Sequence, residues 1–302
     1  MIWAFAAAIS FAAMDLLWRR VLLQTGFWKA LLFRSAFSSV LLLTLIVWTG
    51  QGVHQGLADP APWDAKAVIR VFGMPVFTGV GGLLLFSLAL RQAPVYLVAA
   101  IVNMTGLSVV LWNGWLYPGQ IEWSGWLIGS LMTAFTGLAI WLVLSFKLHR
   151  SKEGKKGWGL VLSMLAVLTW GRGYVQYPES LKESDALTLA ASVELGVFIM
   201  ALLLTLISRS QVISRAHSQR LDRTPWRLLW LVGTGVGLAA WALCMAYDEW
   251  PAYKVGVVAL LTPILVVSWS ALVDKEKLTV SDVVAFLLVV ASQFLFVWSE
   301  WD

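Results

Sequence analysis

Long apolar stretches recur along the whole chain, and they constrain its fold more than any other feature. Each is long enough to cross about 30 Å of hydrocarbon as an α-helix. Within hydrocarbon the backbone amides must be satisfied inside the segment, which favours helices. The sequence therefore predicts an all-α integral membrane protein with ten transmembrane helices, at 1–20, 28–49, 69–90, 94–117, 124–146, 157–176, 186–208, 227–247, 254–273 and 280–299.

Composition supports this class. Of the 302 residues, 59% are hydrophobic and 13% are charged, whereas soluble domains carry about 25% charged residues. The net charge of +5 reports membrane topology in such a chain, and we expect no nucleic-acid partner. Cys244 is the single cysteine, so no intrachain disulfide forms. No basic leader precedes the first apolar stretch, and we expect no cleavable signal peptide.

Lysine and arginine are distributed unequally between the two predicted sides. The connections after helices 1, 3, 5, 7 and 9 contain sixteen of them, and the opposite side contains only Lys66, Arg70, Lys182 and Lys254. Since cytoplasmic loops are enriched in these residues, the first side is predicted to be cytoplasmic. Both termini would then face outward across a cytoplasmic membrane.

The second half of the chain echoes the first at an offset of 157 residues. The segment "QAPVYLVAAIVNMTGLSVVLWNGWLYPGQI" (92–121) aligns without gaps with "EWPAYKVGVVALLTPILVVSWSALVDKEKL" (249–278). Pro94 then matches Pro251, and Tyr96 matches Tyr253. With five helices per half, the second copy enters the membrane from the other side. We therefore predict two inverted five-helix repeats in one bundle, 1–150 and 151–302, an architecture common in secondary transporters.

Short motifs in the second half resemble the EamA-type drug/metabolite transporter superfamily. They are a mid-span proline followed by Glu-x-Leu, here Pro263, Glu276 and Leu278, and the pair Trp170-Gly171 in the first helix of the half. In the first half only an arginine early in the second helix, Arg34, fits the pattern. Where the pattern has proline, glutamate and Trp-Gly, that half has Gly106, Gly119 and Met14-Asp15. The resemblance implies a ten-helix transporter of small metabolites and leaves its substrate open. Members often keep both termini in the cytoplasm, which the charge distribution contradicts.

Charged residues within the apolar stretches are the first site candidates, because ionisable groups are rare and costly inside a membrane. Counted from the helix ends at 1.5 Å per residue, Asp15 and Arg34 share a depth towards the cytoplasm, and Glu194 and Arg172 share one towards the outside. We predict these two ion pairs. Arg91 on the inner side and Asp248 on the outer side are further gate candidates. The pairs either flank the translocation path as gates or substrate contacts, or are fixed structural pairs, with Arg19 as another partner for Asp15.

Midplane candidates are less charged. Asn103 and Thr105 in the fourth helix, and Thr262 and Pro263 in the ninth, lie near central depth. A mid-span proline frees a backbone carbonyl. Trp170 and Tyr174, one turn apart, form either an aromatic wall of the site or ordinary packing. For Asn103, site lining and helix–helix contact stay equally open.

Motifs for catalysis are missing from the sequence. It has no Gly-x-x-x-x-Gly-Lys-Ser/Thr loop, and its three histidines, His54, His149 and His217, are scattered through predicted loops without metal-ligand spacing. We expect no enzyme, no cofactor and no metal. A gradient or exchange would supply energy, with Asp15 or Glu194 as proton carrier.

The sequence favours a secondary transporter that works by alternating access. Its substrate would be a small polar or amphipathic metabolite, with an amine or an amino-acid-like zwitterion favoured over a polyanion because no basic cluster lies at central depth. The alternatives are a flippase for a lipid-linked headgroup and a non-transporting membrane subunit. Beyond the substrate and the lipid bilayer the expected partner is a second copy or none, as a homodimer or monomer.

Overall fold

The computed structural model describes residues 1–25, 27–50, 69–93, 104–121, 156–212 and 226–259, with Val98, Ile101, Val102 and single positions between 124 and 136 and between 261 and 292. Every regular element in these ranges is a helix. Five of the helices are long and apolar enough to cross a membrane, at 2–22, 27–49, 74–92, 186–206 and 226–249. An all-helical multi-pass membrane fold, as predicted, is therefore what the described part of the chain adopts.

The helices agree with the predicted spans to within a few residues over most of the described part. The first half contributes α1 (Ile2–Thr25), α2 (Phe27–Thr49), a π-helical turn η1 (Ile69–Gly73) that continues into α4 (Met74–Gln92), and α6 (Thr105–Leu116). The second half contributes α8 (Lys156–Tyr174), the short α9 (Tyr177–Leu181), α10 (Ala186–Val212), α11 (Trp226–Glu249) and α12 (Ala252–Ala259). The predicted helices 124–146 and 280–299 lie mostly outside the described residues.

Two spans that were predicted as single helices are interrupted near their middle. In 94–117 the chain makes a turn at Met104, whose N–H donates to the carbonyl of Ile101 at 2.9 Å. In 254–273 a turn lies at Leu261, whose N–H donates to the carbonyl of Val258 at 3.0 Å. At the first break the hydroxyl of Thr105 donates to the carbonyl of Val102 and competes with the helical bonds.

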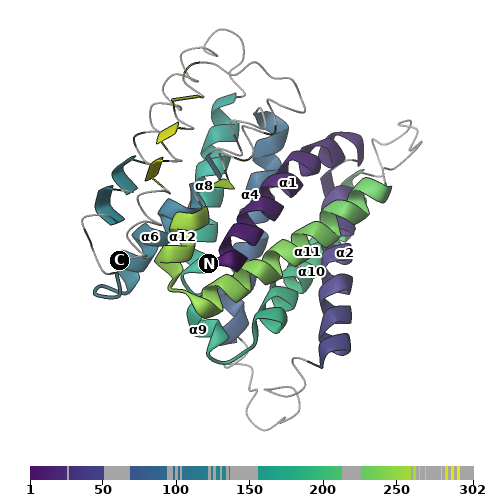
Figure 1. Cartoon of the computed structure of the whole chain (residues 1–302). Coiled ribbons are helices and arrows are strands. Elements are labelled where there is room, and N and C mark those ends of the chain that lie inside the picture. The colour runs from purple at the N-terminus through teal and green to yellow at the C-terminus, as the bar shows by residue number, and fades with distance from the viewer. Residues whose placement is uncertain are drawn as a thin grey trace.

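The helices form one bundle in which the two halves of the chain interleave. Figure 1 shows α1 beside α11 through the middle of the molecule, and α10 beside α2 on one flank. On the other side α4 packs against α8, and α6 packs against α12.

Glycines permit several of these close contacts. A Cβ on Gly173 of α8 would collide with the Thr78 side chain of α4, and one on Gly171 would collide with Ser108 of α6. On α11, a Cβ on Gly233 would come within 2.8 Å of the Arg34 carbonyl oxygen of α2. Small residues at such positions are typical of helix packing in membranes.

Large apolar side chains cover the outer surface of the bundle. Val47, Phe77 and Leu111 are 82%, 72% and 63% exposed, although they lie within long helices. In water such an apolar surface would favour association, whereas lipid tails accommodate it. The described helices therefore present a lipid-facing exterior.

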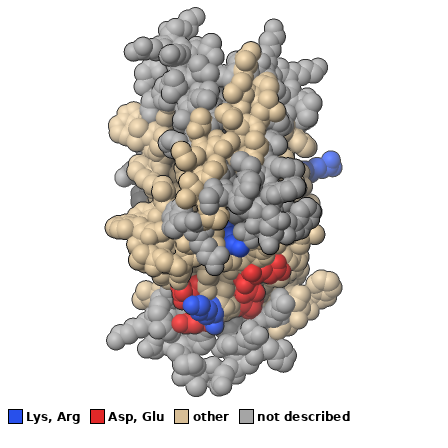
Figure 2. All heavy atoms as spheres, turned by 60° about the vertical axis from the view of Figure 1, so that its left-hand side comes forward, with Lys and Arg blue, Asp and Glu red and all other residues tan. Residues whose placement is uncertain are grey.

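Charged side chains gather at the two ends of the bundle. The end that contains α9 is rich in acids, and Figure 2 shows acidic side chains together at the lower end of the molecule. The described charged residues at or beside this end are Arg172, Glu179, Lys182, Glu183, Asp185, Asp248, Glu249 and Lys254. At the other end the described charged residues are all basic: Arg20, Lys29, Arg91 and Arg227.

Candidate functional site

A cavity of about 110 Å³ lies at the centre of the bundle. On the same measure a single water needs on the order of 10–15 Å³, so there is room for several waters or a small metabolite. We call it the central cavity. Its walls come from α1, α2, α4 and α6 of the first half and from α8, α11 and α12 of the second. Six predicted site residues line it: Asp15, Arg34, Thr105, Trp170, Tyr174 and Thr262.

Asp15 is the carboxylate of the central cavity. It lies on the cavity-facing side of α1, where Ala8, Phe11 and Trp18, at helical spacing from it, also line the wall. Among the described residues Asp15 makes no hydrogen bond and no ion pair. Arg34 lines the same cavity. Asp15 is therefore placed to receive a ligand group that donates hydrogen bonds.

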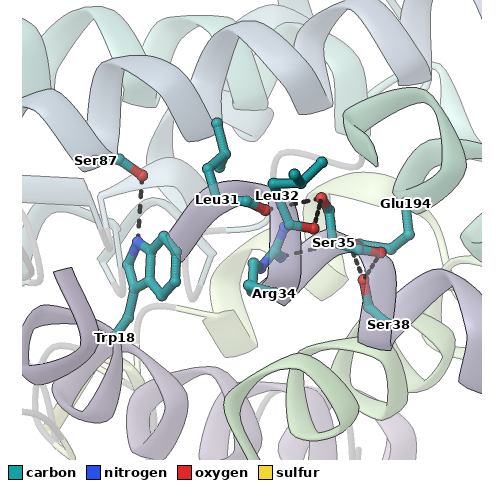
Figure 3. A network of polar contacts seen from close by, with 8 residues as sticks. All are labelled: Trp18, Leu31, Leu32, Arg34, Ser35, Ser38, Ser87 and Glu194. Carbon is teal, nitrogen blue, oxygen red and sulfur yellow. Dashed lines mark hydrogen bonds and ion pairs between the residues drawn. The ribbon is translucent and has the colours of Figure 1, made fainter. Parts of the chain in front are cut away.

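Arg34 forms a buried ion pair with Glu194, as Figure 3 shows. Nη2 of Arg34 donates to Oε1 of Glu194 at 3.2 Å, and the Ser38 hydroxyl donates to Oε2 at 2.5 Å. The side chains of Arg34 and Glu194 are only 8% and 6% exposed. Nη1 of Arg34 is buried without a hydrogen-bond partner among the described residues. Nη2 of this guanidinium thus binds Glu194, whereas Nη1 does not.

This geometry corrects both predicted ion pairs. Glu194 binds Arg34 rather than Arg172, and Asp15 shares the central cavity with Arg34 without an ion pair to it. The prediction used Cα depths, with Arg34 about 9 Å from one boundary and Glu194 about 12 Å from the other. About 9 Å of hydrocarbon then separates them. Because α2 and α10 pack side by side, an arginine and a glutamate side chain together bridge that gap.

The remaining charged candidates lie away from the central cavity. Arg172, in the last turn of α8, donates from Nη1 to Oε1 of Gln176 at 3.5 Å. Arg91 lies over the Phe27 ring at 5.7 Å, at the basic end of the bundle, and Asp248 is exposed at the acid-rich end. Asn103 and Pro263 lie outside the described residues.

Aromatic side chains form much of the cavity wall. Trp170 packs against Phe86 with ring centroids 5.6 Å apart, and Tyr174 lies 5.9 Å from Tyr247. The indole N–H of Trp18, which also lines the cavity, donates to the Ser87 hydroxyl of α4 at 3.2 Å, which fixes its ring (Figure 3). The cavity thus combines a predominantly apolar, aromatic lining with a few polar groups, as small-molecule sites do.

A second, smaller cavity of about 60 Å³ adjoins the first. Arg34, Trp170 and Tyr174 line both cavities, so they stand between them. The walls that belong to the second cavity alone include Glu194, Tyr177 and Cys244. Tyr177 is the first residue of α9, which places this cavity towards the acid-rich end of the bundle.

Several of these residues were not predicted. Ser38 lies four residues after Arg34 and Trp18 three after Asp15, so helical spacing could have indicated both. Tyr247 gave no such signal, because aromatic residues are frequent throughout the apolar stretches. In the described part of the chain, no three His, Cys, Asp or Glu side chains converge as metal ligands would.

Comparison with known proteins gives a family match for the second half of the chain. Residues 157–298 match the model of the EamA-like transporter family. A comparison with curated proteins gave no match. Among solved structures 29 chains match, and one of them, a crystal structure, superposes with a TM-score of 0.65 at 18% identity over 96% of this chain and 94% of its own. At that identity the likeness concerns the fold alone. The second half of the chain, residues 157–298, is therefore similar to the EamA-like transporter family, which is part of the drug/metabolite transporter superfamily.

Proposed function

We propose that the protein is a secondary transporter that moves a small polar or amphipathic metabolite through the central cavity by alternating access. The observation that carries this proposal is the cavity itself, which both halves of the chain line and in which Asp15 and Arg34 face a shared space. A sealed, non-transporting subunit would lack a cavity at this depth. The cavity extends to Thr262, near the predicted midplane, and so favours transport.

Two inverted repeats, 1–150 and 151–302, account for the way the helices pair. At an offset of 157 residues, α1 corresponds to α8 and α4 to α11, so the contact of α1 with α11 and the contact of α4 with α8 are equivalent. Under the same operation α2 corresponds to α10, and these two helices pack against each other.

The interrupted helices support the same symmetry. Met104 and Leu261, where the two turns occur, are separated by 157 residues. The next residues, Thr105 and Thr262, both line the central cavity. Discontinuous helices at the interface between inverted repeats are where transporters of this kind bind their substrates.

The substrate we propose is an amine or an amino-acid-like zwitterion. Asp15 offers a carboxylate for an ammonium group, and Arg34, which lines the same cavity, offers positive charge for an anionic group. Aromatic rings such as those of Trp170 and Tyr174 suit an apolar portion and attract cations through their faces.

We further propose that the acid-rich α9 end faces outward and the basic end faces the cytoplasm. The charge distribution of the described residues follows the positive-inside rule in this orientation. The N-terminal amine lies at the α9 end, 3.7 Å from Glu249, and would be outside. Arg91 and Asp248 then lie near the inner and outer mouths, where we keep them as gate candidates.

Uptake by the purified protein in proteoliposomes tests this function. We expect saturable uptake from a panel of radiolabelled amines and amino acids, and its loss in Asp15→Asn, which replaces the carboxylate by a neutral group of similar size. The yield of folded protein for the variant is the control. Full uptake by Asp15→Asn at normal yield would exclude substrate binding at Asp15.

A further inference from the structure

We propose that the second cavity is a binding site for an organic ammonium group and that Arg34 occupies the position of that cation in the present conformation. The inference rests on the proposed function, because it makes this cavity a second binding site for the same class of substrate. It goes beyond that function by naming Glu194, rather than Asp15, as the carboxylate that binds the ammonium group in this second site.

The lining of the second cavity carries the chemistry. Glu194 presents a carboxylate that is 6% exposed, beside the rings of Trp170, Tyr174 and Tyr177. The rings of Tyr174 and Tyr177 pack edge to face with centroids 5.2 Å apart. A buried carboxylate among aromatic faces is the combination that holds ammonium groups, through an ion pair and cation–π attraction.

Arg34 satisfies this anionic site from within the protein. Its Nη2 donates to Glu194 at 3.2 Å, while the same side chain lines the central cavity. A ligand ammonium that reaches Glu194 has to displace this guanidinium. The pair therefore closes the second cavity to cations for as long as it is intact.

The central cavity provides the displaced guanidinium with another partner. Asp15 shares that cavity with Arg34 and makes no ion pair within the described part of the chain. Nη1 of Arg34 is buried and has no hydrogen-bond partner among the described residues, so the hydrogen-bonding capacity of this guanidinium is only partly used. When an ammonium group binds Glu194, the Arg34 guanidinium would move from Glu194 to Asp15. Each of the two carboxylates would then be paired with one cation.

Cys244 provides a chemical probe of access to the second cavity. It lines that cavity, is 1% exposed, and is the only cysteine of the chain. Its modification by methyl methanethiosulfonate in the purified, detergent-solubilised protein therefore reports access to this cavity alone, with Cys244→Ser as the blank.

The experiment compares variants that weaken the pair with a matched control. Arg34→Gln removes the internal cation, and Ser38→Ala removes one of the two hydrogen bonds to Glu194 that Figure 3 shows. Ser39→Ala removes a neighbouring buried hydroxyl that has no hydrogen-bond partner among the described residues. We expect Arg34→Gln and Ser38→Ala to be modified about tenfold faster or more, because a hydrogen bond to a charged group shifts an equilibrium by at least that factor. Ser39→Ala should match the wild type.

Protection by a probe amine then identifies the site. In Arg34→Gln, 2-phenylethylamine should slow the modification of Cys244 in a saturable way, whereas the uncharged 2-phenylethanol should not. The further change Glu194→Gln should abolish the protection. If Arg34→Gln does not fold, the same probes are applied to Ser38→Ala.

The proposal is overturned if Ser38→Ala and Ser39→Ala are modified equally fast, or if the amine and the alcohol protect alike. Modification needs no transport, so the two proposals fail separately. Liposome uptake without amine-specific protection contradicts this inference alone. Protection without uptake supports the ammonium site and contradicts the proposed transport function.

Discussion

At the scale of single residues, the Arg34–Glu194 pair is the contact with the largest expected energetic effect. Both side chains are buried inside the bundle, and each compensates the other's charge. Removal of one partner from a buried pair leaves an uncompensated charge and destabilises a protein by about 3–5 kcal/mol. Replacement of both partners by apolar residues of similar volume is often neutral.

This difference gives a test of the pair by a double-mutant cycle. We expect Glu194→Leu to lower the free energy of unfolding by about 3–5 kcal/mol. The double variant Arg34→Met, Glu194→Leu should recover most of that loss. Thermal or denaturant unfolding in detergent measures both, with Asp248→Asn, an exposed acid, as a control that should change stability by less than about 0.5 kcal/mol. Equal destabilisation of the single and double variants would show that the two charges do not compensate one another.

The sequence predicted which charged residues lie in the site, but it did not predict correctly which of them form ion pairs. Asp15, Arg34 and Glu194 were evident because charges are rare in apolar stretches. Their partners depended on which helices are neighbours and on how far long side chains reach, and helix-end counting supplies neither. Thr105 and Thr262 were evident from their central depth and now lie on one cavity.

At the scale of helices, close packing depends on where glycines lie. Gly173 faces the Thr78 side chain across the α8–α4 contact, whereas a Cβ on Gly129 would meet nothing within 4 Å. Both residues are in helical segments, so the intrinsic preference for alanine over glycine favours the substitution in each. The two glycines differ in their surroundings, because only Gly173 is in close contact with a neighbouring helix.

Gly173→Ala and Gly129→Ala are therefore a matched pair of variants. Gly173→Ala should destabilise the protein by about 1–3 kcal/mol, as overpacking does. Gly129→Ala should leave it unchanged or stabilise it by up to about 1 kcal/mol. The unfolding temperature in detergent measures both effects. A Gly173→Ala protein as stable as Gly129→Ala would mean that α8 and α4 do not pack this closely.

The extent of the helices was predictable, whereas their interruptions were not. Hydrophobic length located α1, α2 and α10, because a span must match the membrane thickness. The turns at Met104 and Leu261 arise from local backbone bonds within apolar sequence, to which hydropathy is insensitive. The proline at 263 predicted a freed backbone carbonyl and no break, and the first half has glycine at the equivalent position 106.

At the scale of the whole molecule, the described residues form an acid-rich end and a basic end, and this asymmetry is the basis of the proposed orientation in the membrane. This asymmetry was visible in the sequence because it depends on which connections carry lysine and arginine rather than on the fold. The cavity at the interface of the two halves was only partly anticipated, since the repeat predicted its location but not its walls.

Orientation is testable by cysteine labelling in a Cys244→Ser background. Glu179→Cys, in α9, should react with a membrane-impermeant maleimide in intact cells. Arg91→Cys, at the basic end, should react only after the membrane is permeabilised. The reverse pattern would place both termini in the cytoplasm, as the family resemblance alone implied.

The central claim is that substrate passes through the cavity between the two halves, and occlusion of that cavity tests it most directly. Thr105→Trp and Thr262→Trp would each fill it from opposite halves, while Leu111→Trp adds the same ring on the lipid-facing side of α6, where Leu111 is 63% exposed. The measurement is uptake of the transported amine or amino acid by proteoliposomes, normalised to folded protein. We predict that both cavity variants lose uptake and that Leu111→Trp retains it. Undiminished uptake by Thr105→Trp and Thr262→Trp would contradict the account.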